Sequence, residues 1–381
     1  MKIALTGDVF LGGDLCKFNA IESIQVKSYL EADTRIVNLE QAISDNNYLE
    51  DKGTLYTKSE SLLKLRSMRV DVAGIANNHI HDKGLVGIQE TKEHLTAAGV
   101  RCFGAGKTLV ESSESIWLSE DLVIIGYCEF EKPYLKSVAV ASDSISGVNP
   151  LRYDKIKQDL EALPANAKAI LYFHWGEEHV WFPPSADIEL AKKLLRHCKV
   201  ALIVGMHSHR PQGYIKYNGK FAYMSLGNFL FPNFFYDQPA QLAHPDLDRI
   251  NQGYDITRQY HGVLGLTYKK WRLINRVSLV VNLDWGTNRC GHQFAIQDDN
   301  SPVVSDIDKL SAIVWSFWIR ILSIVYLLPS SIYKPVEVVL NKPSRMLWRF
   351  GFYMYLLRQW GLKYFTTRVF NKLRRFFLGG L

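Results

Sequence analysis

Five short apolar segments, each followed at once by a polar cluster, constrain the fold of this chain most strongly. Their length and their content of Val and Ile are typical of buried β-strands. The polar cluster begins in each case where the predicted strand ends. The segments are residues 2–6, 35–37, 71–76, 169–173 and 200–204, and the clusters after them are Gly7-Asp8, Asn38-Leu39-Glu40, Asn77-Asn78-His79, His174-Trp175-Gly176 and Gly205-Met206-His207-Ser208-His209.

Helical stretches lie between these predicted strands. Apolar spacing predicts helices over 84–98, 153–163 and 185–197, with Gly99 as a stop signal and Ser185 as an N-cap. Alternating strands and helices predict an α/β fold whose function gathers at the carboxyl ends of the strands. Residues 210–285 are richer in strand signals, with a turn at Asn218-Gly219, and could close a second sheet.

The chain is long enough for one large domain and a smaller appendage. It has 381 residues, of which 47% are hydrophobic and 22% charged, as in an ordinary globular protein. We predict a main domain over 1–300 and a helical extension over 309–381. We also expect the main domain to remain folded when the extension is removed.

Charge is distributed unevenly between these two parts. Residues 309–381 hold 12 Lys and Arg against one acidic residue, Glu337, a balance of +11 within a total of +7. The remainder is therefore mildly acidic, at −4. An acidic body of this kind argues against a nucleic acid as its ligand.

The N-terminus and the cysteines indicate a cytoplasmic protein. The first apolar run is too short for the core of a signal peptide, and Asp8 follows it directly. The five cysteines are odd in number and lack the spacing of a metal site, which favours reduced thiols over a disulfide framework.

The polar clusters together predict one metal centre. They offer carboxylate, amide and imidazole donors, which suit borderline divalent cations, and no thiolate. Each cluster alone has a simpler explanation: Asp8 in a turn, Glu40 as a helix cap, His207 and His209 as a structural pair. On an extended chain, residues two apart point to the same face, so this pair could also bind one ion. The clusters share one position, the strand end, and this predicts a hydrolytic centre that uses Asp8, Glu40, Asn78, His174, His207 and His209.

The order of these motifs resembles the CapA family of capsule and poly-gamma-glutamate synthesis proteins. The resemblance spans roughly residues 1–285 and is most specific in Asn77-Asn78-His79 with Asp82 and Gly84, and in Ser225-Leu226-Gly227-Asn228-Phe229. It implies a fold similar to that of calcineurin-like metallophosphatases, a four-layer α/β/β/α sandwich with the metal site at one end of two sheets.

Roles follow from the resemblance residue by residue. The six donors named above would hold one or two divalent ions, Mn, Fe or Zn. His79 would protonate a leaving group or steady a phosphoryl oxygen, unless it is only a packed histidine, and Asp82 would orient it. Glu177 and Asn228 would touch substrate or only hold loops.

The chain also departs from the calcineurin-like pattern. Phe10 stands where those enzymes have a histidine, so one metal position would be poorer in nitrogen donors. Met206 and Ser208 replace residues often found beside the histidine pair, without removing a donor.

Two functions remain open from the sequence. The first is a metal-dependent phosphoesterase-like hydrolase acting on a phosphoester or a cell-envelope polymer. The second is a non-catalytic metal-binding component of a polymer synthesis or export complex. Phe10 favours the second, and the Asn78-His79 pair with His207 and His209 favours the first.

The basic extension suggests contact with a membrane. Residues 311–328 are apolar except for Arg320 and are marginal in length for spanning a bilayer, so spanning, lying in the interface and packing on the body all remain open. Residues 345–377 mix cations with aromatic residues, as two short helices with a break near Gly361. We expect peripheral binding to the anionic inner face of the cell membrane; a helical cap or dimer element and a nucleic-acid surface are the alternatives.

Overall fold

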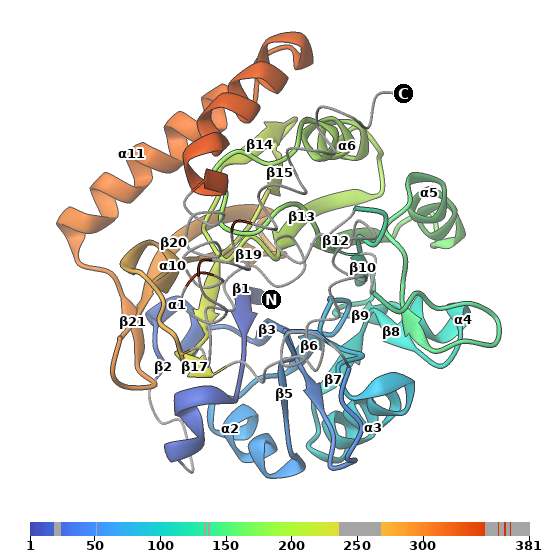
Figure 1. The fold of residues 1–381 in the computed structure, drawn as a ribbon. Helices are drawn as coiled ribbons and strands as arrows, with labels where there is room; N and C mark the ends of the chain where they lie inside the picture. Colours follow the sequence, from blue (N-terminus) through green and yellow to red (C-terminus); the bar gives the residue numbers. More distant parts are fainter. Residues whose placement is uncertain are drawn as a thin grey trace, which may run out of the picture.

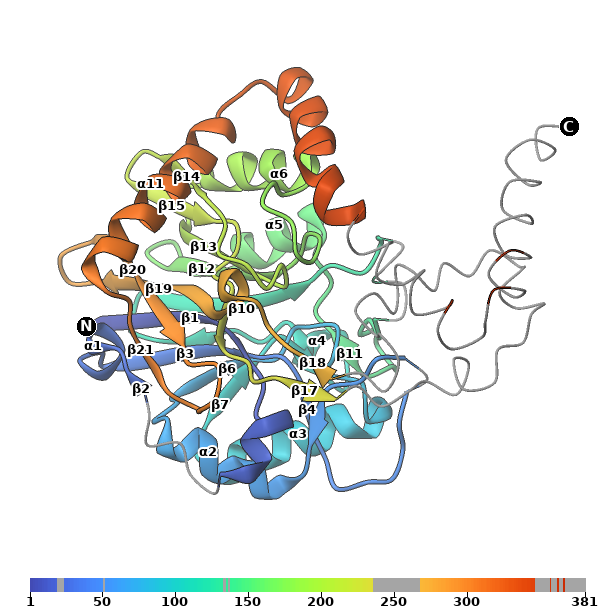
Figure 2. The same ribbon diagram turned by 60° about the vertical axis from the view of Figure 1, so that its left-hand side comes forward.

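A computed structural model describes residues 1–18, 24–50, 52–132, 135, 138–235 and 268–346, with the isolated residues 357, 362 and 366. Two β-sheets lie face to face in it, with helices on their outer sides (Figures 1 and 2). The predicted fold class, an α/β/β/α sandwich, is therefore confirmed.

The larger sheet carries the N-terminal strand at its centre. Strands β1 (Lys2–Val9), β3 (Thr34–Leu39), β6 (Val72–Gly74) and β7 (Arg101–Phe103) run parallel, and β19 (Val277–Asp284) joins β1 in the opposite direction. A ninth strand, β16 (Asn228–Leu230), pairs in parallel with the end of β1. The order of the other eight is β2 (Ile24–Gln25), β21 (Val304–Asp306), β20 (Arg289–Gln297), β19 (Val277–Asp284), β1 (Lys2–Val9), β3 (Thr34–Leu39), β6 (Val72–Gly74) and β7 (Arg101–Phe103).

The smaller sheet has four parallel strands between two antiparallel edge strands. Its edge hairpin turns at Asn218 and Gly219, with φ of 47° and 80°. Both values lie in the left-handed region that a tight hairpin turn requires, and the predicted turn is confirmed. The order is β14 (Tyr214–Tyr217), β15 (Lys220–Tyr223), β13 (Val200–Met206), β12 (Lys168–His174), β10 (Leu122–Cys128) and β9 (Ile116–Trp117).

Helices cover the outer faces of both sheets. The predicted helices are confirmed as α3 (Gly84–Ala97), α5 (Tyr153–Ala162) and α6 (Ser185–Leu195). Gly99 lies beyond the end of α3 with φ of 76°, as a stop signal should. The predicted cap of α6 is wrong, because Pro184 occupies the N-cap and Ser185 is the first helical residue. Among the described residues, the other helices are α1 (Lys27–Leu30), α2 (Leu62–Ser67), α4 (Leu109–Ser112), α10 (Leu273–Arg276), α11 (Lys309–Val325) and a helix over residues 330–346, with 3-10 turns η1 (Gly13–Lys17) and η2 (Ser59–Ser61).

Three two-stranded ribbons complete the described structure. They are β4 (Ala42–Ile43) with β5 (Tyr56–Thr57), β8 (Ala105–Gly106) with β11 (Gly147–Val148), and β17 (Phe234–Phe235) with β18 (Tyr268–Lys269).

The alternation of β1 divides the core into two layers. Ile3 and Leu5 belong to the apolar cluster between the sheets, whereas Ala4 belongs to the cluster beneath α1, α2 and α3. Between the sheets, the Tyr172 hydroxyl donates to the carbonyl of Thr6 at 3.1 Å. This contact and the shared core fix the two sheets relative to each other, close to the strand ends that carry the predicted donors.

The start of the C-terminal extension packs on this body. Helix α11 lies beside β14 and β20, and the chain continues as a helix over residues 330–346 (Figure 2). Ile319, Leu322, Tyr326 and Tyr333 are buried and belong to the same apolar cluster as Ile3, Leu5 and the buried side chains of α6. The sequence allows residues 311–328 to span a bilayer, to lie in its interface or to pack on the body. In the structure, one face of this segment packs on the body. Among the described residues, no helix combines the length and the hydropathy that a bilayer-spanning helix requires. The predicted break near Gly361 and most of the basic aromatic residues lie outside the described part of the chain.

Candidate metal centre

The predicted donors come together where the two sheets meet. Asp8 lies near the end of β1 and Glu40 directly after β3, its neighbour in the larger sheet. His174 ends β12, and His207 follows β13, its neighbour in the smaller sheet. Because β1, β3, β12 and β13 present their carboxyl ends at the same edge, residues far apart in sequence become neighbours.

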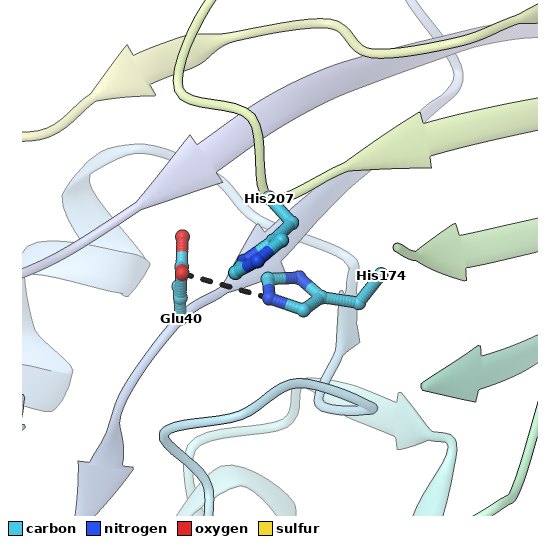
Figure 3. A group of neighbouring side chains, drawn as sticks. All are labelled: Glu40, His174 and His207. Carbon is cyan, nitrogen blue, oxygen red and sulfur yellow. Dashed lines mark ion pairs between the residues drawn. The ribbon is translucent and has the colours of Figure 1, made fainter. Parts of the chain in front are cut away.

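A first group of possible ligands consists of Glu40, His174 and His207, whose donor atoms lie within 4.8 Å of one another. Figure 3 shows the three side chains directed toward one another from the ends of different strands. His174 Nε2 is 3.6 Å from Glu40 Oε1, and the rings of His174 and His207 have centroids 4.6 Å apart. Asn78 extends this group, because its Oδ1 is 2.7 Å from His174 Nε2.

A second group consists of Asp8, Glu40 and His209, again with donor atoms within 4.8 Å. His209 Nδ1 is 3.4 Å from Asp8 Oδ2 and 3.8 Å from Glu40 Oε2. Glu40 thus belongs to both groups through its two oxygens. One carboxylate between two sets of donors is the arrangement expected for two adjacent cations.

The carboxylate oxygens at the centre are better placed to bind a cation than to form hydrogen bonds with neighbouring side chains. Asp8 and Glu40 are fully buried, yet Asp8 Oδ2 and both carboxylate oxygens of Glu40 have no hydrogen-bond partner. Burial, with Asp8 and Glu178 nearby, raises the pKa of Glu40 well above its usual range. Buried carboxylates without donors are costly, and a divalent cation would remove that cost.

The histidines are suited to bind as neutral ligands. Burial, together with His207 and His209, lowers the pKa of His174 well below its usual range. A neutral imidazole keeps a nitrogen lone pair available for a metal. The Asn38 amide nitrogen lies 2.8 Å from Asp8 Oδ1 and 3.4 Å from His174 Nδ1, and so helps to orient one donor of each group.

His79 stands beside the donors in a chain of buried polar contacts. Its Nδ1 is 2.7 Å from Asp82 Oδ2, and Asp82 Oδ1 is 2.6 Å from Lys52 Nζ. Lys52 Nζ also donates to the carbonyl of Asn78 at 2.6 Å. Burial lowers the pKa of His79, and Asp82 opposes this shift. Burial opposes the ionisation of Asp82, but Lys52 and His79 outweigh it and lower the pKa of that carboxyl.

The backbone of the histidine pair differs from the sequence prediction. His207 and His209 have φ of 86° and 54°, so this segment is not the extended chain that the prediction assumed. It is a turn after β13, and both rings still reach the centre. Such left-handed backbone at non-glycine residues is strained and is often found at functional sites.

The two predicted substrate contacts have protein partners. Asn228 lies opposite Asp8 in the sheet, and its Oδ1 is 2.9 Å from His209 Nδ1. Glu177 binds the guanidinium of Arg345 through both oxygens, at 3.0 and 2.6 Å. Both side chains therefore hold other residues in place. Their contact with a substrate stays a prediction.

Phe10 closes the centre on one side with apolar surface. It packs against Phe231 and Phe234 with ring centroids 5.4 Å apart in each case. Phe231 and Trp271 in turn lie 5.2 Å from the ring of His209. The second group thus has an aromatic wall where the calcineurin-like pattern has a further histidine.

Sequence reasoning missed Lys52, Asn38 and Glu178. Lys52 lies in a loop between β4 and β5, away from any strand end, so the pattern that located the donors could not locate it. Asn38 belongs to the Asn38-Leu39-Glu40 cluster, but the sequence does not show that it contacts donors of both groups. Glu178 follows Glu177 and raises the pKa of Glu40, which no spacing in the sequence indicates.

Comparison with known proteins now assigns the chain to a family. Residues 2–233 match the family described as bacterial capsule synthesis protein PGA_cap, and this segment includes every donor of both groups. The chain belongs to this family. The resemblance found in the sequence motifs is thereby confirmed.

Curated relatives match about half of the chain. A probable polyglutamine synthesis accessory protein of Mycobacterium tuberculosis is 27% identical over 213 residues, which are 52% of this chain and 56% of that protein. The PGA biosynthesis protein CapA of Bacillus subtilis is 28% identical over 179 residues, 46% of this chain and 47% of that protein. The chain thus spans about half the length of the relatives it matches.

Two solved structures are similar in outline. The calcineurin-like phosphoesterase YfkN from Bacillus subtilis is 12% identical with a TM-score of 0.35, covering 81% of this chain and 88% of that one. TT1561 of Thermus thermophilus is 10% identical with a TM-score of 0.35, covering 76% and 97%.

Proposed function

We propose that this protein is a metal-dependent hydrolase of the phosphoesterase type that acts in the metabolism of a capsule, poly-gamma-glutamate or related cell-envelope polymer. The observation that carries the proposal is the position of Glu40. It is fully buried, its oxygens lack hydrogen-bond donors, and it is shared by two groups of possible ligands.

Divalent Mn, Fe or Zn at these groups would supply an activated water and offset charge on the attacked group. Asp8, Glu40 and His209 would hold one cation, and Glu40, Asn78, His174 and His207 the other. His79 would give its proton to the leaving oxygen. Asp82, which contacts His79 Nδ1, would stabilise the protonated ring that this step needs.

The relatives' names support the polymer setting. One is named for polyglutamine synthesis and others for PGA or capsule biosynthesis. Envelope polymers are made and exported at the membrane, so we place this protein in the cytoplasm, peripheral at the inner face of the cell membrane. The substrate would be a phosphoester or an amide-linked polymer of that pathway.

One observation favours a second candidate, a non-catalytic metal-binding component of a polymer synthesis or export complex. The aromatic wall around Phe10 leaves the second group with a single nitrogen donor, His209. An ion held there would be bound more weakly, and a single ion at the first group could serve a structural purpose.

Metal content and turnover, measured on the same variants, separate the two functions. We expect the purified protein to contain Mn, Fe or Zn and to hydrolyse an aryl phosphodiester or monoester. His207→Ala should lose both metal and turnover. His79→Ala should keep its metal and lose turnover, because it removes the proton donor and no ligand. A wild-type protein that holds metal yet hydrolyses neither ester with any of these ions would favour the non-catalytic component.

A further inference from the structure

The two C-terminal helical segments expose many large apolar side chains. On α11, Leu310 is 77% exposed and Phe317 67% exposed, far more than a side chain of a packed helix. The exposed apolar residues of α11 itself, Leu310, Ile313, Val314, Phe317 and Ile324, recur at spacings of three, four and seven residues, which places them on one side of that helix. We call this surface the outer helical face; it consists of Leu310, Ile313, Val314, Phe317, Ile324, Leu327, Ile332, Val338, Val339, Leu340 and Met346.

The charged residues exposed between these side chains are all cations. Lys309, Arg320, Lys334 and Lys342 are exposed along the same two helical segments. The one acidic residue in 309–381, Glu337, is buried and lies 3.0 Å from Arg345 Nη2. The outer helical face is therefore apolar and positively charged, and the exposed acid nearest to it in the chain is Asp308, the N-cap of α11.

The opposite side of the same helices is fixed to the body. Ile319 and Leu322 are buried, and the Ser323 hydroxyl accepts from the backbone of Tyr214 at 2.9 Å. Further along, the hydroxyls of Tyr326 and Tyr333 each donate to a backbone carbonyl at 2.7 Å. Arg345 then joins the second helical segment to Glu177. The helices are thus held in place with their apolar side outward.

We propose that the outer helical face docks on an anionic membrane surface, with α11 lying along the plane of the bilayer. Its apolar side chains would enter the interface, and its cations would reach the anionic headgroups. An exposed apolar surface of this extent needs a partner, and the four exposed cations along it select one of negative charge.

Charge argues against two other partners for the outer helical face, namely a second copy of the chain and residues 347–381 of the same chain. In a two-fold dimer through this face, the four cations of one copy would face the same four of the other. Residues 347–381 contain seven Lys and Arg and no Asp or Glu, so this segment offers no counter-charge either. An anionic lipid surface is complementary in charge to the outer helical face and to residues 347–381. The proposal refines the membrane location proposed above and does not depend on the metal chemistry.

A fluorescent label reports directly which surface meets the lipid. In the full chain, the exposed Cys16 and Cys198 are replaced by Ser, and a single label is attached through Phe317→Cys. Val110→Cys is the matched control, because Val110 is 75% exposed on α4, which lies on another side of the molecule (Figure 1). Vesicles of phosphatidylcholine with phosphatidylglycerol, containing brominated lipid as a quencher, are compared with phosphatidylcholine alone.

We expect the label at position 317 to be quenched on the anionic vesicles and the label at 110 to stay unquenched. Raising the salt concentration should weaken binding, since the cations contribute to it. In the same full chain, Val314→Asp with Phe317→Asp should weaken vesicle binding at least tenfold, whereas Val110→Asp should not. Val314, Phe317 and Val110 are all exposed, so the far-UV circular dichroism of these variants should match that of the unsubstituted protein.

Three results would overturn the proposal. The first is a protein that floats with vesicles while the label at 317 stays unquenched, which would assign binding to another segment. The second is a protein that binds no vesicles. The third is a label at 317 that becomes protected from solvent as the protein concentration is raised in the absence of lipid, while light scattering shows a dimer. This result would identify a second copy of the chain as the partner.

Discussion

At the scale of single residues, the chemistry depends on side chains with very different sequence signals. Asp8, Glu40, His174 and His207 could be predicted because a strand end fixes where each one lies. Lys52 could not, because it reaches its partners from a loop. It is nevertheless buried, with 7% of its surface exposed, and it contacts both Asp82 and the backbone of the donor Asn78. We infer that Lys52 keeps Asp82 ionised beside His79.

Replacing Lys52 by Met should therefore impair the proton donor more than the metal groups. We expect kcat to fall by roughly 10–100-fold, the usual cost of losing a positioning contact. The fall should be greatest for esters with poor leaving groups, which need a proton most, and Lys52→Arg should restore part of it. Rates for a series of aryl esters with leaving groups of graded pKa measure this.

The exposed Lys58 provides a control, and Lys58→Met should leave the same rates unchanged. An equal loss of rate for good and poor leaving groups, together with loss of metal, would instead mean that Lys52 only supports the fold of the loop.

At the scale of elements, the sequence predicts which strands exist better than it predicts how they end. The apolar runs identify β1, β3, β12 and β13, but their irregular ends depend on contacts with distant segments. The register of β1 shifts near Asp8, where β16 pairs with it. The turn at His207 and His209 is likewise set by tertiary packing, which is why an extended pair was predicted there.

Gly7 shows how closely β1 and β16 approach. A Cβ at this position would lie 1.7 Å from the carbonyl oxygen of Gly227, a backbone atom that has no room to move. Gly7→Ala should therefore separate the two strands and lower the free energy of unfolding by about 3 kcal/mol or more. Because Asp8 and Asn228 lie on these strands, metal content should fall as well. Urea unfolding and metal analysis measure both effects.

Gly291, in β20 of the same sheet, has no atom within 4 Å of the corresponding position. Gly291→Ala should change stability by no more than about 0.5 kcal/mol. Equal stability of the two variants would contradict the close approach of β1 and β16.

At the scale of the whole molecule, the sequence identified the layers but not the way in which the extension joins them. The apolar residues of α11 are compatible with a bilayer, a membrane interface or a protein core. Composition alone does not show which side of the helix packs against the body and which side is exposed. In the structure, one side belongs to the core and the other forms the outer helical face. The division depends on where Tyr214, Trp181 and Pro183 happen to lie, far away in sequence.

This packing changes the expectation for a shortened chain. Ending the chain at residue 308 would remove Ile319, Leu322, Tyr326 and Tyr333, each at most 1% exposed. At roughly 1.5–3 kcal/mol for each buried side chain, the free energy of unfolding should fall by about 5 kcal/mol or more. A chain ending at residue 346 keeps these side chains and should unfold at a clearly higher temperature than the chain ending at 308. Thermal unfolding of the two truncated proteins tests this, and equal melting temperatures would contradict a structural role for α11.

Anomalous diffraction from crystals grown with Mn²⁺ tests the central claim most directly, namely that donors from both sheets bind divalent cations around Glu40. We predict anomalous density within bonding distance of Glu40, flanked by His174 and His207 on one side and by Asp8 and His209 on the other. Density only at surface sites, with Glu40 bonded to protein or water alone, would contradict it.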